Sequence, residues 1–139
     1  MNKTLVKRSI RATGAALLAI FAVAAIAQTT TVDVDALANC ANLNGGLAIA
    51  PVYTGFDAGT YTIKITSSNA TYCTGRSCAH PNVALTIDDG VNYHTDTVIV
   101  GRTKATTLSF GGPAHVWAYF LDTQCEDNRG GSVLQFTQN

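Results

Sequence analysis

The chain has little charge of either sign and no apolar run long enough to cross a membrane as a helix. Only 13% of its 139 residues are charged. The main apolar run, Gly14 to Ile26, falls short of the roughly 20 residues that a spanning helix needs. After this run the sequence shows no helical periodicity, no internal repeat and no low-complexity segment. These absences argue against repeat architectures and against a helical domain.

Catalytic motifs are missing as well. The sequence contains no Gly-x-Ser-x-Gly, no His-Glu-x-x-His and no P-loop. Asp88 and Asp89 are adjacent, but a glycine follows them, and we interpret the three residues as a hairpin turn. The histidines lack the spacing of a zinc site; they are His80, His94 and His115. We therefore predict that the protein is not an enzyme. A hydrolase without short motifs would need a pocket with a titratable cluster, and the sequence reveals none.

The first 27 residues have the pattern of a bacterial Sec-type signal peptide. Four basic residues come first: Lys3, Lys7, Arg8 and Arg11. The apolar run follows, and Ala25-Ile26-Ala27 fits a cleavage site before Gln28. We predict a cleaved signal helix over 1–27 and one secreted or periplasmic domain over 28–139, with an uncleaved anchor as the alternative.

Cleavage would change the charge balance. Four of the nine basic residues lie in the leader, which leaves five basic against nine acidic residues and a net charge near −4. Nucleic-acid-binding domains present a basic face. We therefore expect no nucleic-acid partner, and no membrane association once the leader is removed.

All four cysteines follow the leader: Cys40, Cys73, Cys78 and Cys125. An even number of cysteines in an oxidising compartment predicts two disulfides, for which three pairings exist. We favour Cys73–Cys78 as a local clasp and Cys40–Cys125 as a link from the start of the domain to an acidic loop. Four thiolates around zinc are a weaker reading, because no Cys-x-x-Cys pair occurs.

Short alternating runs predict eight or nine strands. The clearest run is 60–66, in which Tyr61, Ile63 and Ile65 share one face. The others are 32–36, 47–53, 83–87, 91–93, 97–100, 106–110, 114–121 and 133–137. We expect 28–31 to be a loose end, 54–59 a turn, and Trp117 a core residue. Strands at spacings of about 8–12 residues indicate an all-β, antiparallel β-sandwich or jelly roll.

An acidic loop follows the most apolar of these strands. Three carboxylates and one asparagine fall within seven residues: Asp122, Glu126, Asp127 and Asn128. Two glycines close the loop before the last strand. Calcium takes six to eight oxygen ligands, which a bent loop can supply. The alternative is a polar hairpin loop that binds no ion.

Three stretches resemble the PA-I type galactophilic lectins, which are calcium-dependent galactose-binding jelly rolls. They are GLAIAPVYTGFDAGTYTIKITSSNATY at 46–72, WAYFLD at 117–122, and DNRGG followed by SVLQF at 127–136. The likeness covers most of the predicted domain. It implies a galactose-binding-like sandwich for this chain.

The resemblance also implies a ligand set. Tyr72 would give its carbonyl to calcium, and Asp122, Asp127 and Asn128 would give side-chain oxygens. One further carbonyl would come from 124–126, and two sugar hydroxyls would complete the shell. His80, Asp122 and Asp127 would contact the sugar. This reading describes an exported, lectin-like protein with a carbohydrate or glycoconjugate partner, and it is compatible with a homo-oligomer.

A second hypothesis keeps the fold without the ligands. Cys125 lies inside the acidic loop, and Arg129 directly follows Asn128. The disulfide and the Arg129 guanidinium, paired with Asp127 or Glu126, could replace the cation. The protein would then be a secreted, disulfide-stapled structural or adhesion module.

Overall fold

The computed structural model describes residues 27–45, 52–73, 78–79, 82–90 and 96–139. These residues form nine strands and one 3-10 helix, with no α-helix among them. The strands are β1 (Thr29–Asp35), β2 (Cys40–Asn42), β3 (Val52–Phe56), β4 (Gly59–Ser68), β5 (Asn82–Asp88), β6 (Asp96–Gly101), β7 (Thr106–Phe110), β8 (Ala114–Asp122) and β9 (Gly131–Gln138), and the helix is η1 (Cys125–Asp127). None of these residues belongs to a helix long and apolar enough to span a membrane.

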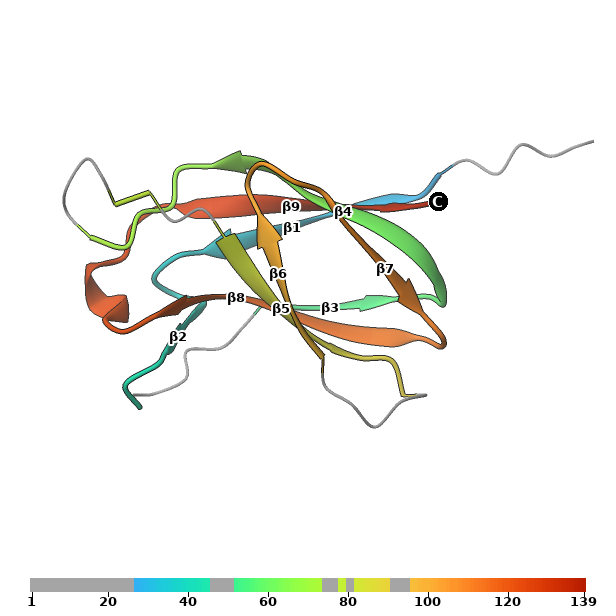
Figure 1. Ribbon diagram of the computed structural model, residues 1–139, viewed down its shortest axis with the longest axis horizontal. Coiled ribbons are helices and arrows are strands. Elements are labelled where there is room, and N and C mark those ends of the chain that lie inside the picture. The colour runs from blue at the N-terminus through green and yellow to red at the C-terminus, as the bar shows by residue number, and fades with distance from the viewer. Residues whose placement is uncertain (1–26, 46–51, 74–77, 80–81, 91–95) are drawn as a thin grey trace, which may run out of the picture.

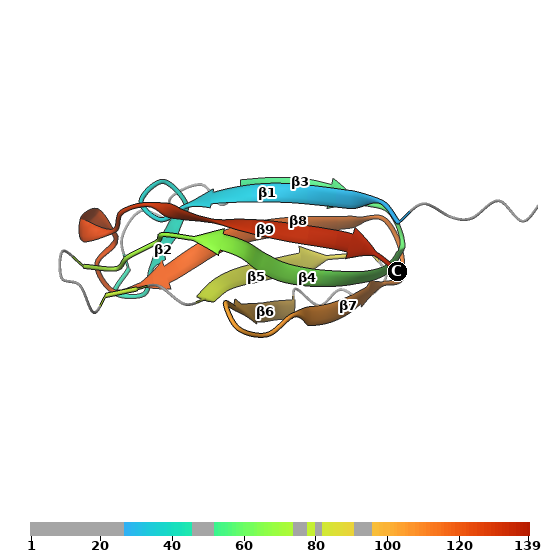
Figure 2. The ribbon, with the colours of Figure 1, turned by 90° about the horizontal axis from the view of Figure 1, so that it is seen from above.

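The strands form two facing sheets, as the strand pattern predicts. One has the order β1-β9-β4-β7, and the other has the order β2-β8-β5-β6, with β3 also paired to β8 (Figure 1). Figure 2 shows β1 and β3 along one long side of the sandwich and β6 and β7 along the other. All pairings are antiparallel except the short pairing of β2 with β8.

Strand β8 lies mid-sheet, as its apolar sequence predicts. One of its edges pairs with β5, while the other edge pairs with two different strands along its length. The first half of this edge pairs with β3, from Ala114 to Ala118. The last three residues pair with β2, which places Asn42 opposite Asp122. The end of β8 is therefore supported on both sides where the acidic loop begins.

Alternate residues of each sheet fill the space between the layers. Ile63, Phe120 and Phe136 are fully buried. Four aromatic rings pack at the end where β3 meets β4, with centroid separations between 4.4 and 6.0 Å; they are Phe56, Tyr61, Phe110 and Phe136. The prediction that Trp117 belongs to the core is wrong. Its neighbours Val116 and Ala118 face inward, so Trp117 faces outward and is only half-buried.

Two local expectations are also wrong. Residues 29–31 are part of β1, because they continue the antiparallel register against β9 from Gln135 to Thr137. Strand β3 extends to Phe56, where we expected a turn, because Gly55 and Phe56 pair with the start of β8. The strand predicted at 91–93 and most of the one predicted at 47–53 lie outside the described residues.

Candidate functional site

The candidate ligand residues gather at one end of the sandwich, which we call the acidic end. It comprises Thr71–Cys73, Asp122–Arg129 and β2, and it lies at the left of Figure 1. Thr71 and Arg129 exchange two main-chain hydrogen bonds, of 2.9 and 3.1 Å. Segments far apart in sequence are thereby joined immediately before Tyr72 and immediately after Asn128.

Asp122 is held at the last position of β8. The Leu43 N–H, just after β2, donates to the Asp122 carbonyl at 2.7 Å. One carboxylate oxygen, Oδ1, accepts the Thr123 N–H at 2.6 Å. The other, Oδ2, is buried, and no described residue donates a hydrogen bond to it. Because a buried charged oxygen is costly without a partner, this atom needs an explanation.

Asn128 is fully buried, and its carboxamide has one defined orientation. The Nδ2 group donates to the Ala36 carbonyl at 3.0 Å and to Cys40 Sγ at 3.3 Å. Since a carbonyl can only accept, the nitrogen must face Ala36, which turns Oδ1 the other way. Oδ1 is buried and receives no hydrogen bond from the described part of the chain. The position of the amide oxygen is therefore fixed, but the oxygen accepts no hydrogen bond from the described residues.

Asp127 supplies a third such oxygen. Its Oδ1 is buried and has no hydrogen-bond partner among the residues described. Two carboxylate oxygens and one amide oxygen, all desolvated and unpaired, thus come from one seven-residue segment. Hard cations such as calcium coordinate oxygens of this kind. The described residues contain no group of three His, Cys, Asp or Glu side chains that could hold a metal ion, so amide or carbonyl oxygens would have to contribute.

Both predicted disulfides are present, and both lie at the acidic end. Cys40 and Cys125 are joined across 85 positions of sequence, and Cys73 and Cys78 across five. Their Cα atoms are 5.8 and 5.3 Å apart, respectively. The pairing favoured from the sequence is therefore confirmed. Two disulfides in a small domain indicate an oxidising, extracellular or periplasmic environment.

Arg129 does not take the role that the second hypothesis gave it. Its Nη1 group donates to the main-chain carbonyls of Glu126, at 3.1 Å, and Asn128, at 2.6 Å. Asp127 Oδ1 stays unpaired beside it. The guanidinium therefore braces the main chain of the loop and leaves this carboxylate oxygen without a counter-charge.

Two predicted ligand residues remain, Tyr72 and His80. Tyr72 directly follows the Thr71–Arg129 bridge, and its N–H donates to the Cys78 carbonyl at 2.9 Å. Its side chain is 42% exposed, so this position borders solvent. His80 lies outside the described residues.

Sequence analysis missed the support that β2 and the residues on either side of it give to the site. Ala36, Cys40 and Leu43 hold Asn128 and Asp122 through hydrogen bonds. Asn69 was also missed, although its side chain accepts the Gly131 N–H at 2.9 Å and fixes the exit of the loop. Of these, only Cys40 carried a recognisable signal, through its predicted disulfide.

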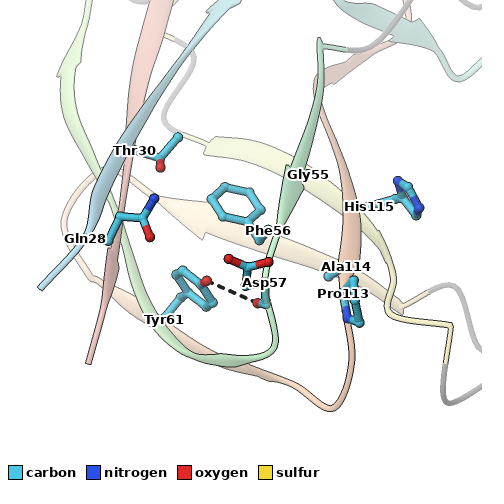
Figure 3. Close-up of a pocket in the computed structure, with 9 residues that line it drawn as sticks. All are labelled: Gln28, Thr30, Gly55, Phe56, Asp57, Tyr61, Pro113, Ala114 and His115. Carbon is cyan, nitrogen blue, oxygen red and sulfur yellow. Dashed lines mark hydrogen bonds between the residues drawn. The ribbon is translucent and has the colours of Figure 1, made fainter. Parts of the chain in front are cut away.

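A hollow lies at the end of the sandwich opposite the acidic end (Figure 3). It has a volume of about 280 Å³, and its floor carries the Phe56 and Tyr61 rings. The Tyr61 hydroxyl donates to the Asp57 carbonyl at 3.1 Å, and the His115 ring stands apart at the margin. No unpaired buried side-chain oxygen or nitrogen was found among its described lining residues. Among the described residues, the unpaired buried side-chain oxygens lie at the acidic end instead.

No family model, no curated protein and no solved structure matches the chain. The likeness to the galactophilic lectins therefore depends on the three sequence stretches alone.

Proposed function

We propose that the protein is an exported, calcium-binding β-sandwich of the galactose-binding-like, jelly-roll type, with a lectin-like function. The observation that carries the proposal is the set of three buried, unpaired oxygens: Asp122 Oδ2, Asp127 Oδ1 and Asn128 Oδ1. Native proteins rarely leave buried polar atoms unpaired, and a bound ion is one of the few reasons for it. Calcium would give the buried oxygens of Asp122, Asp127 and Asn128 a positively charged partner.

Main-chain carbonyls would complete the protein part of the ligand shell. The sequence resemblance assigns one to Tyr72 and one to 124–126. Within the latter segment, the Cys125 carbonyl already accepts the Asn128 N–H, and the Glu126 carbonyl accepts Arg129. We therefore favour Gln124, which is exposed and caps η1.

A carbohydrate is the ligand class that this arrangement favours. A bound calcium ion with open positions coordinates vicinal hydroxyls, which are hard oxygen donors. Asp122 and Asp127 would accept hydrogen bonds from the same sugar, and the family resemblance adds His80 as a further sugar contact. A galactose-like sugar follows from the family resemblance. A stapled structural or adhesion module without ligands is the competing proposal, supported by the two disulfides at this end.

Calorimetric titration of the oxidised protein with calcium tests the proposal. We expect saturable binding and a higher melting temperature, because a ligand bound only by the native state adds about 2.7 kcal/mol at 100 times its Kd. Asp127→Asn should abolish this gain. Without calcium the same variant should be at least as stable as the wild type, because it removes a partly buried, unpaired carboxylate.

The matched control is Asp57→Asn, which neutralises an exposed carboxylate at the other end of the sandwich and should bind calcium normally. Retention on immobilised galactose in calcium, with elution by EGTA, then tests the sugar. An oxidised protein that neither binds calcium nor changes its melting temperature with EGTA would leave the stapled module as the function.

A further inference from the structure

We propose that the Cys40–Cys125 disulfide is a positioning element of the cation site, so that calcium affinity depends on the oxidation state of this disulfide. The inference rests on the proposed function and goes one step beyond it. Two observations connect the disulfide to the proposed cation site. Each cysteine contacts a candidate ligand residue, and the two cysteines lie on different elements of the acidic end.

Strand β2 connects the two halves of the ligand set. Its main chain pairs with the end of β8, with Asn42 opposite Asp122, and the next residue, Leu43, donates to the Asp122 carbonyl. Its first residue, Cys40, is bonded to Cys125 in η1. The strand thus holds Asp122 through hydrogen bonds and holds η1, which contains Asp127, through a covalent bond.

Asn128 contacts both cysteines. Its side-chain nitrogen donates to Cys40 Sγ at 3.3 Å, and its main-chain N–H donates to the Cys125 carbonyl at 3.1 Å. The first bond helps to set the direction of the carboxamide, and the second sets the position of the residue after η1. Both therefore determine where the unpaired Oδ1 lies.

Reduction would remove the covalent part of this support. A dithiol reductant transfers two electrons and two protons, the Cys40–Cys125 bond becomes two thiols, and the dithiol becomes a cyclic disulfide. Helix η1 would then be held to β2 without a covalent link, and Asp127 and Asn128 could move relative to Asp122. The Cys73–Cys78 disulfide cannot substitute for this link, because neither of its cysteines lies in β2 or in η1.

The coupling must act in both directions. If oxidation raises calcium affinity by some factor, calcium raises the equilibrium constant for oxidation by the same factor. Groups that orient metal ligands typically change affinity by about 10- to 100-fold when they are removed. We expect reduction of the Cys40–Cys125 disulfide to weaken calcium binding about tenfold or more. Calcium should then lower the equilibrium constant for reduction of this disulfide by the same factor.

The test uses a Cys73→Ser/Cys78→Ser variant, in which Cys40–Cys125 is the remaining disulfide. Calcium is titrated by calorimetry into the oxidised and the dithiol-reduced forms, with folding checked by circular dichroism. The same pair of titrations is repeated with Asn128→Asp added. Aspartate keeps a ligand oxygen but loses both side-chain donor bonds, so the ratio of the two dissociation constants should fall toward one. A disulfide that acts only through general stability would give the same ratio in both backgrounds.

A second measurement covers the case in which a reduced or substituted form fails to fold. The fraction of Cys40–Cys125 reduced at equilibrium in wild-type protein is followed by thiol alkylation and mass spectrometry, with calcium or with EGTA. The coupling is supported if calcium protects this disulfide from reduction in the wild type and the Asn128→Ala substitution abolishes that protection. Equal dissociation constants for both oxidation states, or equal reduction with and without calcium, overturn it while leaving the proposed function standing. If the oxidised wild type binds no calcium, both fail together.

Discussion

Tyr61 shows how one side chain links the core to the surface at the end away from the candidate site. Its ring is 4% exposed and packs against Phe56 at 5.3 Å and Phe110 at 5.1 Å. Its hydroxyl reaches the Asp57 carbonyl (Figure 3). Burial raises the pKa of this phenol above its usual value of 10.0, and the negative charge of Asp57 adds to the rise.

This pKa predicts a loss of stability in alkali. The folded state holds the Tyr61 proton more tightly than the unfolded state, so its contribution is complete below about pH 10 and is lost as the pH rises through the folded pKa. We expect Tyr61→Phe to reduce the fall in melting temperature above about pH 10. Asp57→Asn should reduce it less, since it removes only the smaller cause. Melting curves at fixed ionic strength measure both, and an unchanged alkaline slope in Tyr61→Phe would contradict the assignment.

At the scale of elements, the alternation of apolar and polar residues was sufficient to predict a strand wherever one face of that strand is buried. The run around Ile63 was predicted because Tyr61 and Ile63 face the core while Thr62 and Lys64 do not. Strand β2 was missed because three residues, Cys-Ala-Asn, cannot display a period, and their pairing with β8 is a tertiary contact. The acidic loop was recognisable from its composition, but the direction of the Asn128 amide was not. That direction depends on Ala36 and Cys40, which are about 90 positions away.

Two isoleucines test this assignment of strand faces. Ile63 in β4 is fully buried between the sheets, whereas Ile99 in β6 is 48% exposed on an outer face. Ile63→Ala should cost about 2–5 kcal/mol, because it leaves a cavity in a packed core. Ile99→Ala, the same change in another strand, should cost less than about 1 kcal/mol. Urea unfolding of both variants measures the difference, and similar losses would show that the faces are misassigned.

For the whole molecule, the two ends of the sandwich are stabilised differently. The end with the aromatic cluster is held by buried rings, whereas the acidic end has short elements, two disulfides and unpaired buried oxygens. Both covalent links thus lie at the end of the sandwich that also carries the unpaired buried oxygens. A bound cation would stabilise this same end, in addition to the disulfides.

The two disulfides should contribute unequally to the stability of the whole chain. In the chain-entropy model, closing the 85-residue separation of Cys40–Cys125 is worth about 4–5 kcal/mol, and closing the five-residue separation of Cys73–Cys78 about 2 kcal/mol. We expect Cys40→Ala/Cys125→Ala to lower the free energy of unfolding by roughly twice as much as Cys73→Ala/Cys78→Ala. Urea unfolding in EGTA measures both losses without any contribution from calcium. Equal losses, or a larger loss for the short loop, would mean that local bracing of the acidic end outweighs the constraint on the unfolded chain.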